Sequence, residues 1–169
     1  MKVDAMQSLN KKILIAYFSH SGNTRLVAEK IQELTEGTLY EIKTEKPYPQ
    51  EYNTVVDLAR TERSSNYRPK LSSAEIDLSQ FDVVILGYPN WWSTMPMVNF
   101  TFLESHNFTG TTILPYCTHE GSGMGISERD IAKTCPTATL LPGLEIRGSR
   151  VRTADNEITN WLRKNQIIA

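Results

Sequence analysis

The chain has 169 residues, 40% of them hydrophobic, which suits one domain with a substantial core. Its 18 Lys and Arg nearly balance 19 Asp and Glu, and no basic stripe is present, so nucleic acid is not an expected partner. No apolar run approaches the roughly 18 residues of a membrane span. We expect a polar leader over residues 1–11, without the apolar stretch of a secretory signal, and a single domain over residues 12–169.

The two cysteines, Cys117 and Cys135, are too few for a disulfide framework, and a reducing cytoplasm is the expected compartment. We interpret both as packing residues. A Cys-x5-Arg phosphatase would need arginine at positions 123 and 141, where Gly123 and Leu141 stand.

The first expected strand covers residues 13–18, and a helical pattern follows with Val27, Ile31 and Leu34 on one face. Between them lies a turn of small polar residues: Ser19, His20, Ser21, Gly22, Asn23 and Thr24. Amides at such a helix start lack partners, and the helix dipole adds partial positive charge there. The turn therefore favours a phosphate site that needs no metal. The alternative is a set of ordinary N-cap residues.

This turn resembles the phosphate loop of flavodoxin-like proteins, whose pattern is roughly [ST]-x-[ST]-G-x-[ST]. His20 occupies the variable position. The resemblance implies that the loop holds the 5′-phosphate of FMN. Two other phosphate motifs, G-x-x-x-x-G-K-[ST] and G-x-G-x-x-G, are absent from the turn.

Further strands and helices alternate along the chain. Strands are expected over residues 38–43, 83–87, 111–116 and 138–146, the last interrupted by Pro142 and Gly143. Helices are expected over residues 53–63, 96–106 and 153–165, and from a capping box formed by Ser127 and Asp130. Five alternations indicate an α/β fold with a parallel sheet. The resemblance implies a flavodoxin-like three-layer αβα sandwich, with a five-stranded sheet in the order 2-1-3-4-5 and ligands at the carboxyl ends of the strands.

The loop after the third strand contains adjacent tryptophans, Trp91 and Trp92. Neighbours in an extended chain diverge, so we expect one indole to face the core and the other a planar ligand. A surface patch or a dimer contact is the alternative. The segment Tyr88–Trp92 resembles a short-chain flavodoxin-like group with a Y-P-x-W-W loop. That resemblance implies that the isoalloxazine ring of FMN is bordered by Pro89, Asn90, Trp91, Trp92 and Ser93.

The loop after the fourth strand carries alternating glycines, Gly121, Gly123 and Gly125, which let backbone approach a flat ligand. An ordinary flexible loop is the alternative. The resemblance implies that the pyrimidine side of the flavin and its ribityl chain are lined by Thr118, His119, Glu120, Gly121, Ser122 and Gly123. His119 and Glu120 are candidates for proton exchange near a bound quinone, although a loop histidine is more often plain polar surface. No catalytic residue is assigned.

These features predict an FMN-binding redox protein. Flavodoxins that act as carriers are strongly acidic, whereas this chain has a net charge of −1. This difference favours an FMN-dependent oxidoreductase that passes electrons from NAD(P)H to a small acceptor such as a quinone. The alternatives are a one-electron carrier that docks on larger redox proteins and a fold relative that serves as a non-redox binding module. A homodimer with Trp91 or Trp92 at its interface is also left open.

Overall fold

The computed structural model describes residues 9–169. Residues 1–8 of the predicted leader lie outside the described residues. The rest of the leader runs beside the C-terminal segment, where the amide of Leu9 donates to the carbonyl of Ile167 at 3.2 Å. Within residues 9–169, none of the helices combines the length and apolar character that crossing a bilayer requires.

The sheet is parallel throughout, and its main path runs in the order β2-β1-β3-β4-β5. Its strands are β1 (Ile13–Tyr17), β2 (Thr38–Glu41), β3 (Val83–Pro89), β4 (Thr112–His119) and β5 (Thr139–Leu140). Val84, Ile85 and Leu86 of β3 are fully buried, as expected for a central strand that is covered on both faces. The predicted fold class and strand order are confirmed.

A sixth strand, β6 (Leu144–Arg147), also pairs with β4. β5 pairs with the first residues of β4, and β6 pairs with its last four residues, from Tyr116 to His119. The two are therefore halves of one edge strand. The break falls at Pro142 and Gly143, as predicted, because proline cannot donate to the ladder.

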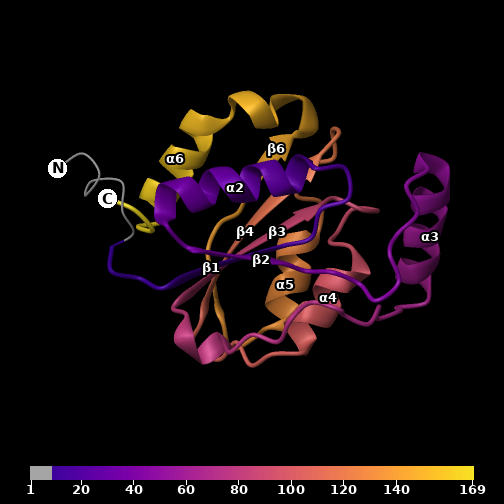
Figure 1. Ribbon diagram of the computed structural model, residues 1–169, viewed down its shortest axis with the longest axis horizontal. Helices are drawn as coiled ribbons and strands as arrows, with labels where there is room; N and C mark the ends of the chain where they lie inside the picture. Colours follow the sequence, from indigo (N-terminus) through magenta and orange to yellow (C-terminus); the bar gives the residue numbers. More distant parts are fainter. Residues whose placement is uncertain (1–8) are drawn as a thin grey trace.

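Helices cover both faces of the sheet (Figure 1). On one face lie α2 (Asn23–Thr35) and α6 (Asp155–Lys164), which pack with residues such as Ile15 and Ile85. On the other face lie α4 (Met97–Glu104) and α5 (Ser127–Thr134), which pack with residues such as Leu14 and Leu86. Short 3₁₀ helices, η1 (Leu78–Gln80) and η2 (Gly148–Thr153), precede β3 and α6. Both cysteines are buried in the second of these cores, which confirms that they pack there.

The helix α3 (Tyr52–Ser64) is placed differently from the other four. It lies beyond the carboxyl ends of the strands instead of covering a face of the sheet (Figure 1). Only Val55, Ala59 and Glu62 of this helix are buried. The helix thus adds a wall at the edge of the sheet where parallel α/β folds bind ligands.

The predicted capping box at α5 is wrong. Ile126 is the N-cap, and the Ser127 hydroxyl donates to the carbonyl of Met124 at 2.6 Å while it accepts from the Tyr88 hydroxyl at 2.9 Å. Asp130 accepts a hydrogen bond from Thr94 at 2.5 Å. Because both side chains have tertiary partners, neither caps the helix.

Candidate functional site

The loop between β1 and α2 is held open by its own side chains. The Ser19 Oγ accepts hydrogen bonds from the amides of Gly22 and Arg25, both at 3.2 Å. Gly22 is the N-cap of α2 and has a φ of 101°, a conformation that glycine adopts without strain. The loop therefore keeps its shape without a ligand.

Several amides of this loop are available to an anion. Within residues 9–169, the amides of Ser21, Asn23 and Thr24 have no hydrogen-bond partner. They lie at the start of a helix of 13 residues, whose dipole favours negative charge there. The Ser21 side chain is exposed beside them. This arrangement fits a phosphate group.

Buried hydroxyl groups fix the loop to the centre of the sheet. The hydroxyls of Thr24 and Thr118 lie 2.8 Å apart, and both side chains are buried. The Tyr116 hydroxyl donates to the carbonyl of Thr24 at 2.9 Å. Gly87 on β3 makes room for that tyrosine, because a Cβ there would lie 2.1 Å from the Tyr116 ring. The phosphate-type loop is thus positioned by β3 and β4 as well as by β1.

Asn90 connects the loops that follow β3 and β4. Its amide donates to the carbonyl of Thr118 at 2.8 Å, and its Nδ2 donates to the carbonyl of Gly123 at 2.8 Å. Its Oδ1 accepts from the amide of Ser93 at 2.9 Å. The strand register already places Pro89 beside Thr118, so the two loops leave the sheet together.

The two tryptophans diverge, as the sequence predicts. Trp91 is half-buried, and its ring packs edge-on against Phe18, Tyr48 and His20 with centroid separations of 5.3, 5.0 and 5.9 Å. Its contact with His20 places it beside the phosphate-type loop. Of the two indoles, Trp91 is therefore the one next to the predicted ligand.

Trp92 turns toward α3 and is 41% exposed. Its Nε1 donates to the carbonyl of Val56 at 3.0 Å, and the Arg60 guanidinium lies 5.6 Å from its ring centroid. Arg63 donates to the carbonyl of Trp92. Trp92 and Ser93 both have positive φ angles, 57° and 74°. These contacts hold the tight turn against α3.

The glycine-rich loop packs backbone to backbone on this turn. The amide of Ile126 donates to the carbonyl of Ser93 at 2.7 Å. A Cβ on Gly125 would lie 2.2 Å from the same carbonyl oxygen, and Gly125 has a φ of 57°. Gly125 was not among the predicted contact residues, but it determines how closely the two loops approach.

His119 is buried, and both of its ring nitrogens have protein partners. Nδ1 accepts from the amide of Gly121 at 2.8 Å, so Nε2 carries the proton and donates to the carboxylate of Glu145. The side chain therefore shapes the glycine-rich loop. Neither nitrogen is free to exchange a proton with a ligand.

Glu120 approaches the first turn of α2. A Cβ on Gly148 would lie 2.3 Å from Glu120 Oε2 and 2.7 Å from Asn23 Nδ2, so both side chains border the start of η2. The carbonyl of Glu120 accepts a hydrogen bond from Arg147 at 3.0 Å. Ser122 is exposed at the tip of the same loop.

The structure thus brings the three predicted loops together at one edge of the sheet. The contact of their residues with a ligand stays a prediction.

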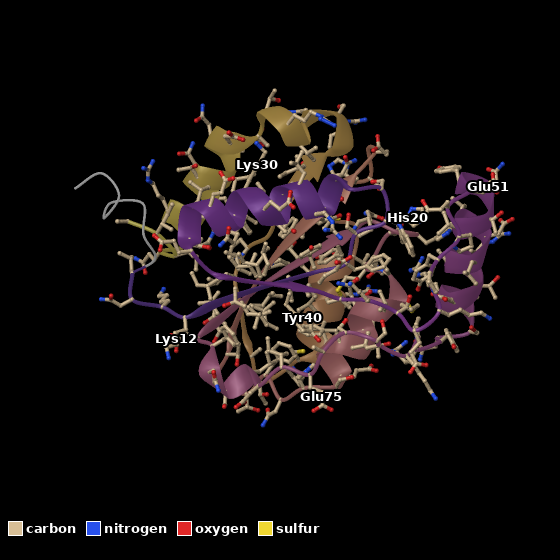
Figure 2. The ribbon with its side chains drawn as sticks, viewed as in Figure 1. Lys12, His20, Lys30, Tyr40, Glu51 and Glu75 are labelled. Atoms are coloured by element: carbon tan, nitrogen blue, oxygen red, sulfur yellow. The ribbon has the colours of Figure 1, made fainter. Side chains whose placement is uncertain are left out.

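Sequence reasoning missed a fourth segment, which follows β2. His20 Nε2 donates to the carbonyl of Pro49 at 2.7 Å, and Figure 2 shows His20 on the side of the body that faces α3. Tyr48 contacts the rings of Phe18 and Trp91, and its hydroxyl donates to Glu62 Oε1 at 2.6 Å. The sequence around Tyr48 predicts a simple turn, and its only local indication of burial is an aromatic residue between two prolines.

A separate hollow of about 500 Å³ lies at the opposite edge of the sheet. Its lining includes Lys12, Gly37 and Phe81, and no residue of the three loops contributes to it. It is distinct from the candidate site.

The parallel order 2-1-3-4-5, with a polar loop of unpartnered amides after β1 and aromatic and glycine-rich loops after β3 and β4, defines a flavodoxin-like α/β protein. The chain belongs to the flavodoxin family, whose sequence profile, described as Flavodoxin, matches residues 12–165.

Solved structures agree with this assignment. A proposed flavoprotein from Bacteroides eggerthii is 34% identical, and the match covers 92% of this chain and 98% of that one with a TM-score of 0.81. A proposed flavoprotein from Bacteroides uniformis is 29% identical, with 90% and 98% covered and a TM-score of 0.80. A flavoprotein from Lactobacillus acidophilus, solved in complex with FMN, is 24% identical, with 89% and 98% covered and a TM-score of 0.73. A comparison with curated protein sequences returns no match.

Proposed function

We propose that the chain binds FMN and acts as a redox protein through it. The observation that carries the proposal is the set of unpartnered amides at Ser21, Asn23 and Thr24, at the start of α2. The family assignment and the FMN complex of the Lactobacillus acidophilus flavoprotein support it. When bound, FMN supplies the redox chemistry, and the protein binds it, orients it and limits its contact with water.

Each of the three loops has a role in this proposal. The β1–α2 loop holds the phosphate, with Ser21 adding a hydroxyl donor. The half-buried Trp91 borders the ring system of the flavin, beside Asn90. The backbone around Gly121 and Gly123 lines the other side, where the hydrogen bonds of His119 fix its shape.

The proposal is tested by comparing FMN with riboflavin, which lacks the phosphate. We expect FMN to bind the purified protein at least about 100-fold more tightly, because riboflavin makes none of the charge-assisted hydrogen bonds. Ser21→Ala should weaken FMN binding by about tenfold and leave riboflavin binding unchanged. Equal affinity for the two ligands would refute the phosphate assignment. A protein that stays colourless in FMN would favour the non-redox binding module.

For the physiological role, we propose an NAD(P)H-dependent reductase of a small acceptor such as a quinone, working in the cytoplasm. The support is the net charge of −1, which gives little electrostatic attraction for a basic protein partner. Rapid oxidation of NADH or NADPH by the FMN-loaded protein with a quinone is the expected result.

The second candidate is a one-electron carrier for larger redox proteins. The exposed Trp92 at the rim of the site favours it, because a large aromatic surface there suits docking or a homodimer seam. Reduction that occurs only when a separate reductase is added would select this candidate. Sedimentation with and without FMN would show whether the chain dimerises.

A further inference from the structure

A buried hydrogen bond lies directly behind Trp91. Tyr48 is 8% exposed and Glu62 is 8% exposed, and the Tyr48 hydroxyl donates to Glu62 Oε1 at 2.6 Å. Glu62 comes from α3, whereas Tyr48 comes from the segment after β2. Within residues 9–169, Glu62 has no ion-pair partner. Its carboxyl group is therefore buried with a tyrosine hydroxyl as its side-chain partner.

Burying that carboxyl group is unfavourable. Burial raises the pKa of Glu62 above its ordinary value, and the hydrogen bond from Tyr48 offsets part of the effect. Burial, followed by the hydrogen bond to Glu62, also raises the pKa of Tyr48, so Tyr48 is the donor over the whole working pH range. An apolar pair of similar volume would fill this space with less desolvation cost, so packing alone does not account for the pair.

The hydrogen bond holds the hydroxyl end of Tyr48 in place, and so keeps the Tyr48 ring against Trp91. Tyr48 and Phe18 meet the Trp91 indole at interplanar angles of 84° and 83°. The indole is therefore confined by two buried rings that are nearly perpendicular to it. His20 of the phosphate-type loop meets it at 70°. A displacement of the Tyr48 side chain would open space on one side of the indole.

We propose that Tyr48 and Glu62 are positioning residues that hold Trp91 in the orientation in which it meets a flat ligand. The flavin part of this inference rests on the proposed function, whereas the effect on Trp91 does not. Glu62 acts from α3, so the helix that stands apart from the sheet is coupled to Trp91 through this hydrogen bond, in addition to its contacts with Trp92.

The experiment uses the full chain with Tyr48→Phe, Glu62→Gln and Glu62→Leu, and Tyr40→Phe as a matched control. Tyr40 also donates its hydroxyl to another segment, at the carbonyl of the exposed Ala74, and its ring packs on Phe102 instead of Trp91. The first readout is the indole N–H resonance of Trp91 without FMN, assigned by its loss in Trp91→Phe. The second is FMN affinity, together with the midpoint potential of the bound flavin. Thermal unfolding shows that each variant is folded.

We expect Tyr48→Phe and Glu62→Leu to shift the Trp91 resonance and to weaken FMN binding by about three- to tenfold, as for the loss of one hydrogen bond. Glu62→Gln keeps an acceptor for Tyr48 and should behave like the unmodified protein. Tyr40→Phe should change neither readout. The inference is overturned if Tyr48→Phe leaves the resonance in place, or if Tyr40→Phe moves it equally.

The two proposals fail separately. If the unmodified protein does not bind FMN, the proposed function is wrong, and the Trp91 resonance still tests the positioning role. If FMN binds but the Trp91 resonance does not respond to Tyr48→Phe, only the positioning role is wrong.

Discussion

A position can require glycine because its φ angle is positive or because a Cβ would clash, and Gly110 and Gly125 differ in this respect. Both have positive φ angles, 57° and 78°. A Cβ on Gly125 would lie 2.2 Å from the Ser93 carbonyl oxygen, whereas a Cβ on Gly110 would meet nothing within 4 Å. A side chain at position 110 would therefore bring backbone strain alone, whereas a side chain at position 125 would bring strain and also a clash at the candidate site.

We expect Gly110→Ala to lower the free energy of unfolding by about 1–2 kcal/mol, the usual cost of a left-handed conformation. Gly125→Ala should lower the free energy of unfolding further, because the loops after β3 and β4 must move apart. Of the two variants, only Gly125→Ala should weaken FMN binding. Urea unfolding and FMN titration of both variants provide the measurements. Equal losses in the two variants would contradict the close packing of these loops.

Glu62 should make the stability of the protein depend on pH. Burial raises its pKa in the folded state, so its contribution to stability is largest at acid pH and is lost as pH rises through the raised pKa. The unmodified protein should therefore gain stability relative to Glu62→Gln as pH falls from 8 to about 5. Urea unfolding of both proteins across this range measures the difference, and a constant difference would contradict burial of the carboxyl group.

Glu51 provides a comparison of opposite sign. The side chain and amide of Thr54, with the amide of Asn53, donate to its carboxylate and lower its pKa. Its contribution is present above the ordinary value of 4.5 and is lost as pH falls through the lowered pKa. In acid, the unmodified protein should therefore lose stability relative to Glu51→Gln.

At the scale of single elements, α3 should open more readily than the other helices. It buries only Val55, Ala59 and Glu62, and polar contacts to Trp92 and Tyr48 hold it at the edge of the sheet. Segments with few buried apolar contacts open locally at low cost. We expect its amides to exchange with deuterium faster than those of α2, and FMN to slow them. Equal protection of α2 and α3 would show that α3 is as firmly packed as the core.

The strands and helices could be predicted because their patterns are local. The buried run of β3, the break at Pro142 and the polar loop before α2 each lie within a few neighbouring residues. The position of α3 could not be predicted, since it depends on Trp92 reaching the carbonyl of Val56, 36 residues away in the chain. The same holds for the predicted cap at Ser127, whose hydroxyl bonds to Tyr88, 39 residues away in the chain, and to the nearby carbonyl of Met124.

The candidate site also has parts that could be predicted from local patterns and parts that could not. The phosphate-type loop follows from one short motif. The divergence of Trp91 and Trp92 was predicted from strand geometry, but the two residues lie beyond the end of β3, in a tight turn where Trp92 has a φ of 57°. Tyr48 and Glu62 had no such signal, because their importance comes only from contact with each other and with Trp91.

For the whole molecule, the near balance of charge predicts how it meets a protein partner. With a net charge of −1, it has little long-range attraction for a basic protein. Electron exchange between the reduced FMN-loaded protein and cytochrome c, a basic probe, should change by less than about twofold between low and physiological ionic strength. A fall of about tenfold on adding salt would indicate a concentrated acidic docking face and would favour the carrier role.

The pairing of Leu9 with Ile167 places both of these segments at the amino edge of the sheet, on the side away from α3 (Figure 1). If the protein were tethered to an electrode through the amino edge of the sheet, its bound flavin would face away from the electrode surface. Its current should then require a diffusing mediator, whereas attachment through a cysteine introduced on α3 should allow direct exchange with the surface.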